Sequence, residues 1–283
     1  MQFLPDILEK HRATIGQRLF LPSGKWGTIM DRFNALVGSR TLCEDEQIWT
    51  FLAACGYAIS GTEGVESLTN ILTGSELFQP DNAKIWMEPM LFPTRKREGR
   101  SSIDLALGTI NLRENTKAGI ELTKTERSWI CFCEMKWYSD LSLDVEYDIH
   151  RNQLARVIEH AIFFNDSAGI PDQCEARYSD SVFIALVTPG VFKEMDGKSR
   201  LYQYKFREYE SDDHANLLKD LKSCAMKLRN PSANIDQQVK RLTGLRWATY
   251  DEIFAQLPDS DICSELKRFW EDRGIYQGRE AST

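Results

Sequence analysis

The sequence predicts an α/β fold in which helices pack on both faces of a mixed central sheet, as three layers, with a helical extension at the N-terminus. Two observations support this prediction. From residue 81 onward, apolar runs of strand length occur in the order strand, strand, strand, helix, strand, whereas the first third of the chain has the apolar spacing of amphipathic helices. No proline- or glycine-rich linker divides the 283 residues, so we expect residues 1–80 to pack on a core of residues 81–283 as one unit.

The N-terminal part is expected to be helical, because apolar side chains recur there every three to four residues. The expected helices span 24–37, 44–57 and 62–78. Asp81 and Asn82 then supply a turn that leads into the core.

The core elements are assigned from the length and pattern of their apolar runs. Strands are expected at 83–92, 101–110 and 129–137, followed by a helix at 148–164 and an apolar strand at 181–188. Helical spacing then returns, which predicts helices at 202–229, 233–242 and 260–273, with a short strand at 245–249.

Two of the expected strands contain charged residues that a buried strand rarely holds. Asp104 interrupts one apolar run, and Glu134 and Lys136 interrupt another. Isolated buried charges are costly, so charges on inner strands are usually paired, coordinated or catalytic. Glu134 and Lys136 project from the same strand face because they are two residues apart, whereas Cys133 and Met135 face the other way. If the two strands pair, Asp104 joins that face, and two carboxylates and a lysine converge.

At these residues the chain resembles the PD-(D/E)xK nuclease superfamily, which includes restriction endonucleases, Holliday-junction resolvases and RecB-type exonucleases. The family signature is an Asp on one strand, a variable loop, and Glu-x-Lys on the next strand. Here it reads as Asp104, the polar stretch 113–127, and Glu134, Met135 and Lys136. The resemblance implies a restriction-endonuclease-like core and one or two Mg²⁺ or Mn²⁺ ions held by Asp104, Glu134 and the main-chain carbonyl of Met135. Carboxylate ligands suit Mg²⁺, which takes one or two of them together with water and substrate phosphate.

Members of the family often add a Glu on a helix before the sheet and a Gln at the start of the helix after it. Glu46, with Glu44 as the alternative, occupies the first position, and Gln153 occupies the second. The resemblance implies that Glu46 completes a second metal position and that Gln153 reaches the metal site or supports it. It also implies that Lys136 orients or deprotonates the attacking water.

The family pattern is not matched in full. Ile103 stands before Asp104, where the family name has Pro, and the three Pro-Asp pairs of the chain lie among turn residues. A second Glu-x-Lys, Glu265 to Lys267, falls in a helical pattern, where residues two apart face different sides. The alternative interpretation of the charged strand residues is an ordinary cross-strand salt bridge at a sheet edge.

The net charge of the chain is -7, with 35 Lys and Arg against 42 Asp and Glu, so the distribution of charge matters more than its sum. Arg95, Lys96, Arg97 and Arg100 form a positive cluster just before the first strand carboxylate, and the stretch 219–246 is also rich in basic residues. We expect the first cluster to contact nucleic-acid phosphates. A solvated loop is the alternative.

The chain has seven cysteines, an odd number without repeated short spacing, which indicates reduced thiols rather than disulfides. They form no compact group of four that would indicate an iron–sulfur cluster. No run of eighteen apolar residues and no basic, apolar leader is present. A soluble, cytoplasmic protein without a membrane partner is therefore expected.

The expected function is that of a metal-dependent nuclease, a hydrolase that acts on nucleic acid. DNA is the favoured substrate because most members of the family cut it. The expected form is an endonuclease in restriction or phage defence, as a monomer or a homodimer. The residues leave RNA as a substrate and exonuclease action open. One alternative is a catalytically silent nucleic-acid-binding subunit with the same fold. Another is a protein-interaction subunit, indicated by the negative charge and by Trp26 and Trp270, although aromatic residues at helical spacing usually belong to a core.

Overall fold

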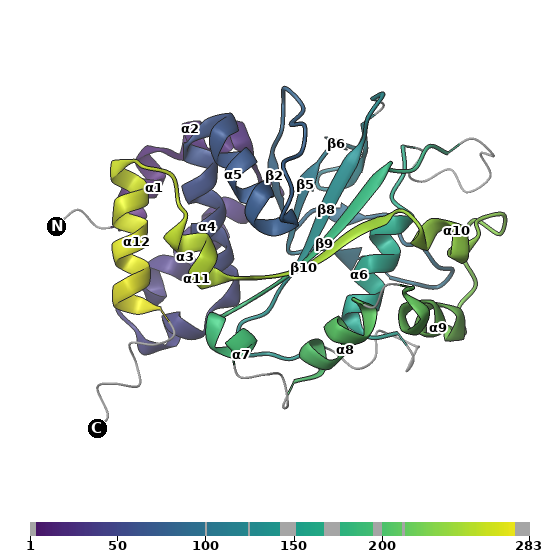
Figure 1. Ribbon diagram of the computed structural model, residues 1–283. Helices are drawn as coiled ribbons and strands as arrows, with labels where there is room; N and C mark the ends of the chain where they lie inside the picture. Colours follow the sequence, from purple (N-terminus) through teal and green to yellow (C-terminus); the bar gives the residue numbers. More distant parts are fainter. Residues whose placement is uncertain are drawn as a thin grey trace.

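A six-stranded mixed sheet runs through the centre of the computed structural model (Figure 1). In spatial order its strands are β1 (Leu19–Phe20), β2 (Ile85–Met87), β5 (Leu105–Gly108), β8 (Trp129–Met135), β9 (Ser181–Thr188) and β10 (Leu242–Thr249). β2, β5 and β8 pair antiparallel, whereas β8, β9 and β10 pair parallel and β1 runs parallel to β2. The structure describes residues 4–99, 101–123, 125–141, 151–166, 176–194, 200–210 and 213–274.

Alternate residues of the strands enter two separate hydrophobic cores. Leu105, Cys133 and Met135 belong to one core, and Ala106 and Phe132 belong to the other, as the two-residue period of a strand requires. Helices therefore cover both faces of the sheet, and Figure 1 shows α4, α5, α11 and α12 on one side and α6, α8 and α9 on the other. The sequence-based prediction of an α/β fold with a mixed central sheet is confirmed.

The N-terminal part is helical, as predicted. Its elements are α1 (Leu4–Lys10), α2 (Arg12–Arg18), α3 (Lys25–Leu36), the 3₁₀ helix η1 (Arg40–Glu44), α4 (Glu46–Ile59) and α5 (Gly61–Thr73). The three predicted helices correspond to α3, α4 and α5, and α1 and α2 were not predicted. α5 ends five residues earlier than expected, because Gly74 adopts φ 70° and ends the helix.

The first two predicted core strands are each divided in the structure. β2 stops before Glu88, which has φ 50°, and β3 (Met90–Leu91) then pairs with β4 (Ser101–Ser102) as a separate ribbon. The segment expected to be a loop after β5 instead forms a hairpin of β6 (Ile110–Leu112) and β7 (Ile120–Leu122). These short elements extend the structure beyond the sheet edge.

The second half of the chain follows the predicted order with different boundaries. Its remaining elements are α6 (Gln153–Ile162), α7 (Gly190–Glu194), α8 (Leu201–Tyr209), α9 (Ala215–Ser223), α10 (Ile235–Val239), α11 (Tyr250–Ala255) and α12 (Asp261–Arg273). The single helix predicted at 202–229 is wrong, because α8 and α9 are separate helices. The predicted start of the helix at 148 lies outside the described residues. None of the described helices has the length and apolar character needed to cross a membrane.

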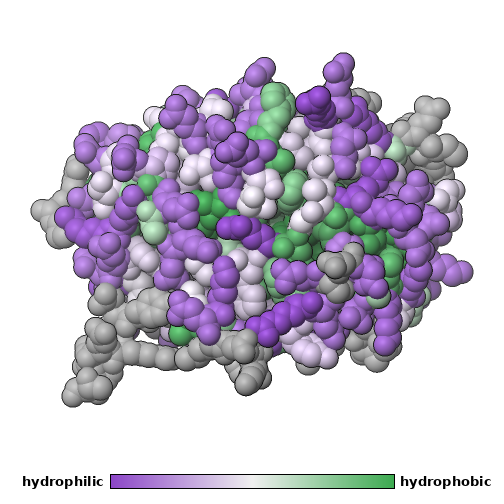
Figure 2. Space-filling model, viewed as in Figure 1, coloured by the Kyte–Doolittle hydropathy of each residue, from purple (hydrophilic) through white to green (hydrophobic). Residues whose placement is uncertain are grey.

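The face of the molecule seen in Figure 1 is largely hydrophilic. Figure 2 shows hydrophobic side chains mainly in a band across the middle of this view, over the region where β10 forms the edge of the sheet. The remaining surface in this view is dominated by polar and charged residues.

Candidate functional site

The carboxylates of Asp104 and Glu134 meet where β5 begins and β8 ends. The two strands pair antiparallel with Leu105 opposite Cys133, so the same register continues to Asp104 opposite Glu134. Asp104 Oδ2 accepts a hydrogen bond of 2.7 Å from the main-chain N–H of Met135. Glu134 is 3 % exposed and faces the side of the sheet that α6 covers. The structure thus brings together the two carboxylates that the sequence placed on neighbouring strands.

Lys136 lies beside Glu134, immediately after the last residue of β8. Its Nζ is 2.8 Å from Glu134 Oε1, and the lysine is buried. Its main-chain N–H donates to the carbonyl of Val187 at 2.8 Å, which continues the parallel pairing of β8 with β9. The Glu-x-Lys pair therefore has the shared orientation that the strand period predicted.

Glu46 contributes a third carboxylate from the start of α4. Asp45 caps this helix by accepting a 3.1 Å hydrogen bond from the N–H of Ile48, and Glu46 follows as the first helical residue. Glu46 Oε2 accepts a 2.8 Å hydrogen bond from the main-chain N–H of Trp137, the residue after the Glu-x-Lys motif. Glu44, the alternative for this position, is exposed in η1. The structure favours Glu46.

Aromatic packing fixes the chain just after Lys136. The indole N–H of Trp137 donates to the main-chain carbonyl of Cys43, and its ring stacks on Trp49 with a centroid separation of 5.6 Å. Both tryptophan side chains are fully or almost fully buried. Because Trp137 fixes the chain just after β8 in this way, the side chain of Lys136 has little freedom to move away from the carboxylates.

The electrostatics of the site are dominated by burial and by repulsion between carboxylates. Burial and then the charge of Glu134 raise the pKa of Asp104 well above its usual range, against the opposing effects of Lys136 and the Met135 N–H. Burial also raises the pKa of Glu134, with Lys136 opposing it and Glu46 adding to it. Burial alone would lower the pKa of Lys136, but the surrounding carboxylates raise it overall. The site thus has an excess of negative charge that favours a bound cation or proton.

The helix after the sheet approaches this site with its N-terminal turn. Gln153 is the first residue of α6, and Asn152 caps the helix by accepting a 3.0 Å hydrogen bond from the N–H of Ala155. The sequence analysis placed Gln153 near the start of a helix expected at 148–164, and in the structure it is the first residue of the described helix. Arg156, one turn further, lies close enough to Glu134 for its charge to lower the pKa of that carboxyl. The sequence analysis missed Arg156, although its position three residues after Gln153 places it on a neighbouring part of the helix surface.

Glu88 is a second residue that the sequence analysis missed. Its φ of 50° is unusual for a residue other than glycine, and its main-chain N–H donates a 3.0 Å hydrogen bond to the carbonyl of Asp104. Its carboxylate pairs with Lys25 Nζ at 2.6 Å and accepts a hydrogen bond from Gln47. The sequence feature that could have identified Glu88 is a charged residue within the otherwise apolar run 85–91.

The donors suit a hard divalent cation, although they form no complete protein cage. Within the described part of the chain, no group of three or more His, Cys, Asp or Glu residues is arranged to hold a metal ion. Asp104, which is half-buried, and Glu134, which is buried, provide two carboxylates, as many as Mg²⁺ usually takes from a protein when substrate phosphate and water supply the rest. The elevated pKa values of both groups fit the same need for a cation.

The structure corrects the prediction that Arg95 contacts nucleic acid. Arg95 is 3 % exposed, and its Nε donates to Glu159 Oε1 at 2.9 Å. Its other nitrogens donate to the main-chain carbonyls of Leu221 at 2.7 Å and Met226 at 2.5 Å. The guanidinium is therefore occupied inside the protein. Its neighbours differ: Lys96 and Arg97 are exposed, and Arg100 lies outside the described residues.

No family model, curated protein or solved structure matches this chain. A functional assignment therefore depends on the site's own geometry and chemistry.

Proposed function

We propose that this chain is a divalent-metal-dependent endonuclease that hydrolyses phosphodiester bonds in DNA. One observation carries the proposal. Asp104 and Glu134 come from neighbouring antiparallel strands and lie opposite each other, with Lys136 Nζ 2.8 Å from Glu134. This is the arrangement that the resemblance to the PD-(D/E)xK superfamily requires. The biological setting that we propose with it, restriction or phage defence, follows from the same resemblance.

The order of the elements supports a restriction-endonuclease-like core of three layers. Three antiparallel strands are followed by a helix and then by a strand parallel to the last of them. Helices from the first third of the chain pack on one face of this sheet, and α6 packs on the other. In this fold the catalytic residues come from the second and third strands, as Asp104 and Glu134 do here.

Two carboxylates would hold the metal ion. Asp104 and Glu134, with the main-chain carbonyl of Met135, would form one position, and Glu46 would contribute to a second. When bound, Mg²⁺ or Mn²⁺ would lower the pKa of a coordinated water and offset negative charge on the phosphate. The raised pKa values of Asp104 and Glu134 support this assignment, because a cation would relieve their repulsion.

Lys136 acts in this proposal by its positive charge. Its pKa is raised by the carboxylates around it, so it keeps its proton near neutral pH. A protonated lysine can orient the attacking water and stabilise charge on a phosphate oxygen, whereas proton removal would require a neutral amine. Gln153 would support the same water from the start of α6. The products should carry a 5′ phosphate, as the resemblance implies.

Incubation of the purified protein with linear, circular and single-stranded DNA, and with RNA, tests the proposal in the presence and absence of Mn²⁺. Lys136→Ala and Asp104→Asn should reduce metal-dependent cleavage by at least about a hundredfold. Lys267→Ala is the matched control, because this lysine belongs to the second Glu-x-Lys sequence on α12 and should leave cleavage unchanged. Wild-type rates in either site variant would refute the proposal.

A catalytically silent nucleic-acid-binding subunit of the same fold is the second candidate. The ion pair of Lys136 with Glu134 favours it, because it provides Glu134 with a counter-ion without any metal. Titration calorimetry with Mn²⁺ separates the two candidates. A nuclease should bind the ion through Asp104 and lose that binding in Asp104→Asn, whereas a silent subunit should give no heat in either protein.

A further inference from the structure

Three separate segments that meet near Phe92 carry six basic residues, two of which contact its ring. They are Lys96 and Arg97 from the loop after β3, Arg113 and Lys117 from the turn between β6 and β7, and Lys227 and Arg229 from the segment after α9. The four residues Lys96, Arg97, Lys117 and Lys227 are exposed, and the two remaining arginines are half-buried. We call this set the cationic surface. Within the described ranges, none of its six side chains forms an ion pair with a carboxylate.

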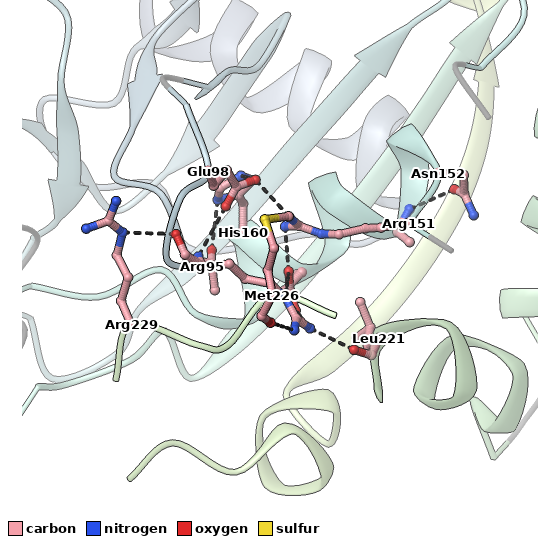
Figure 3. Close-up of polar contacts among 11 residues, drawn as sticks. Arg95, Glu98, Arg151, Asn152, His160, Leu221, Met226 and Arg229 are labelled. Carbon is pink, nitrogen blue, oxygen red and sulfur yellow. Dashed lines mark hydrogen bonds and ion pairs between the residues drawn. The ribbon is translucent and has the colours of Figure 1, made fainter. Parts of the chain in front are cut away.

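Main-chain hydrogen bonds join the first segment to the third. The N–H of Lys96 donates to the carbonyl of Lys227 at 2.9 Å, and the N–H of Arg229 donates to the carbonyl of Thr94 at 2.9 Å. Arg95 lies beneath them and donates to the carbonyls of Leu221 in α9 and Met226 in the third segment (Figure 3). It also donates to a carboxylate of α6. The sequence analysis expected Arg95 to contact phosphate, but its side chain instead binds inside the protein and stabilises the surface formed by its neighbours.

The hairpin brings the second segment to the same place. The N–H of Met90 donates to the carbonyl of Ala118 at 2.7 Å, which holds the hairpin tip against β3. The guanidinium carbons of Arg113 and Arg229 lie 5.7 and 5.3 Å from the centroid of the Phe92 ring. Two guanidinium groups thus share one aromatic ring. Such like charges repel each other unless an anion is present, and cation–π contacts offset only part of that repulsion.

The carboxylate of Glu98, two residues after Lys96, is occupied by other cations. Glu98 Oε1 is 2.9 Å from Arg151 Nη1 and 3.2 Å from His160 Nε2. Burial alone would raise the pKa of Glu98, but the hydrogen bond and charge of His160 and the charge of Arg151 lower it overall. Glu98 therefore remains ionised and faces inward, so it does not neutralise the exposed lysines beside it.

The cationic surface adjoins the carboxylate site along the chain and along α6. Phe92 is four residues after Glu88, so their Cα atoms are at most about 14 Å apart, and Glu88 is hydrogen-bonded to the carbonyl of Asp104. The first turns of α6 bring Arg156 to Glu134, and a later turn of the same helix holds the loop through the hydrogen bond between His160 Nδ1 and the Thr94 hydroxyl, at 2.9 Å. A linear polyanion could contact both places at once.

We propose that the cationic surface binds the sugar–phosphate backbone of a nucleic acid and guides it to the carboxylate site. The proposal rests on the proposed function, but the two can fail separately. The observation that carries it is six cations that have no carboxylate partner among the residues described, on a protein of net charge -7. Because the Phe92 ring is in contact with two guanidinium groups, the surface offers phosphate contacts rather than a stacking platform for bases. Binding should therefore be independent of sequence and strongly dependent on salt.

The test compares two double variants in which lysines are replaced by glutamate. The surface variant combines Lys96→Glu with Lys227→Glu. The matched control combines Lys10→Glu on α1 with Lys267→Glu on α12. The first pair interacts through main-chain atoms only, so its hydrogen bond survives the substitution. Fluorescence anisotropy in EDTA, with duplex DNA, single-stranded DNA and RNA probes, reports binding without cleavage. The surface variant should bind at least one of these roughly tenfold more weakly or worse, and its salt slope, log K against log [NaCl], should be smaller in magnitude by about two or more. The control should retain both values.

Equal binding by the two double variants would overturn the proposal even if the wild-type protein cleaves DNA. Conversely, loss of binding in the surface variant alone would support it even if no cleavage is found, in which case only the nuclease assignment fails. Vesicles containing phosphatidylserine provide a further arm. If the surface variant lost vesicle binding and kept nucleic-acid binding, the surface would be assigned to membranes and the proposal would be rejected.

Discussion

Ionised Asp104 and Glu134 destabilise the folded state, because loss of hydration and the charges of neighbouring carboxylates disfavour their charged forms. Their pKa values in the folded protein are higher than in the unfolded chain. The stability that they contribute is therefore fully present below their unfolded pKa values and is lost as the pH rises through the raised folded values. In the metal-free protein, these groups should oppose folding at neutral and alkaline pH.

Asp104→Asn should accordingly stabilise the metal-free protein. Asn keeps an oxygen that can accept the hydrogen bond from the Met135 N–H, and it removes the buried charge. At pH 8 the free energy of unfolding should rise by about 1 to 2 kcal/mol, and at pH 4 the two proteins should be nearly equal. Thermal unfolding followed by circular dichroism in EDTA at both pH values measures this. A variant that is less stable than wild type at pH 8 would contradict the electrostatic account.

A divalent ion should reverse this order of stability. If only the folded protein binds Mn²⁺, a concentration of a hundred times the dissociation constant raises the free energy of unfolding by about 2.7 kcal/mol. The melting temperature of the wild-type protein at pH 8 should therefore rise with Mn²⁺, whereas that of Asp104→Asn should change little. Equal shifts in both proteins would place the ion elsewhere.

The stability of the protein should fall sharply when Arg95 is replaced by Met and change little when the adjacent Lys96 is. Arg95→Met leaves the buried carboxylate of Glu159 without one of its partners, which should lower the free energy of unfolding by about 3 to 5 kcal/mol. Lys96→Met changes an exposed side chain and should stay within about 0.5 kcal/mol. Urea unfolding compares the two, and similar losses would show that the burial of Arg95 has been misjudged.

Gly108 ends β5 and allows the chain to turn into the hairpin of β6 and β7. Its φ is +126°, and an added Cβ would lie 2.2 Å from the main-chain oxygen of Trp129. Such a contact requires movement of the paired strand β8, because the opposing atom belongs to the backbone. The strands that carry the carboxylates are thus linked to this glycine by main-chain geometry.

Gly108→Ala should therefore lower the free energy of unfolding by at least about 2 kcal/mol. The matched control is Gly27→Ala in α3, where an added Cβ meets nothing within 4 Å and the helix should gain about 0.5 to 1 kcal/mol. Chemical denaturation measures both. A neutral Gly108→Ala would mean that the end of β5 adapts more easily than its backbone contacts indicate.

The hydrophobic core beneath the N-terminal helices joins distant parts of the chain. It contains Leu8 of α1, Phe51 of α4, Met135 of β8 and Leu266 of α12. Trp270 of α12 stacks on Phe254 with a centroid separation of 4.6 Å. A core shared in this way couples the unfolding of the N-terminal helices to that of the sheet.

The whole chain should unfold in a single cooperative transition, as expected for residues 1–80 packed on 81–283. Far-ultraviolet circular dichroism and tryptophan fluorescence should give the same midpoint in urea. Trp49→Ala, in the shared core, should lower that midpoint for both signals by an amount corresponding to about 3 to 5 kcal/mol. Two transitions with different midpoints would instead indicate that the helical part is a separate domain.

Local sequence patterns determined much of this protein. The order of the main elements followed from the change between helical and strand spacing, and the shared orientation of Glu134 and Lys136 followed from the two-residue period of a strand. The position of Gln153 near the start of a helix also followed from local residues. These features were predictable because each depends on neighbours within a few positions.

Only the tertiary structure decided which charges are buried and which segments meet. Arg95 and Lys96 are adjacent and both cationic, yet one binds Glu159 inside the protein and the other is exposed. Lys227 joins Lys96 across more than a hundred residues, and Glu46 reaches the end of β8 across 91 residues. Such contacts depend on how helices and strands pack, and the free energy of burying a charge depends on partners that the local sequence does not contain.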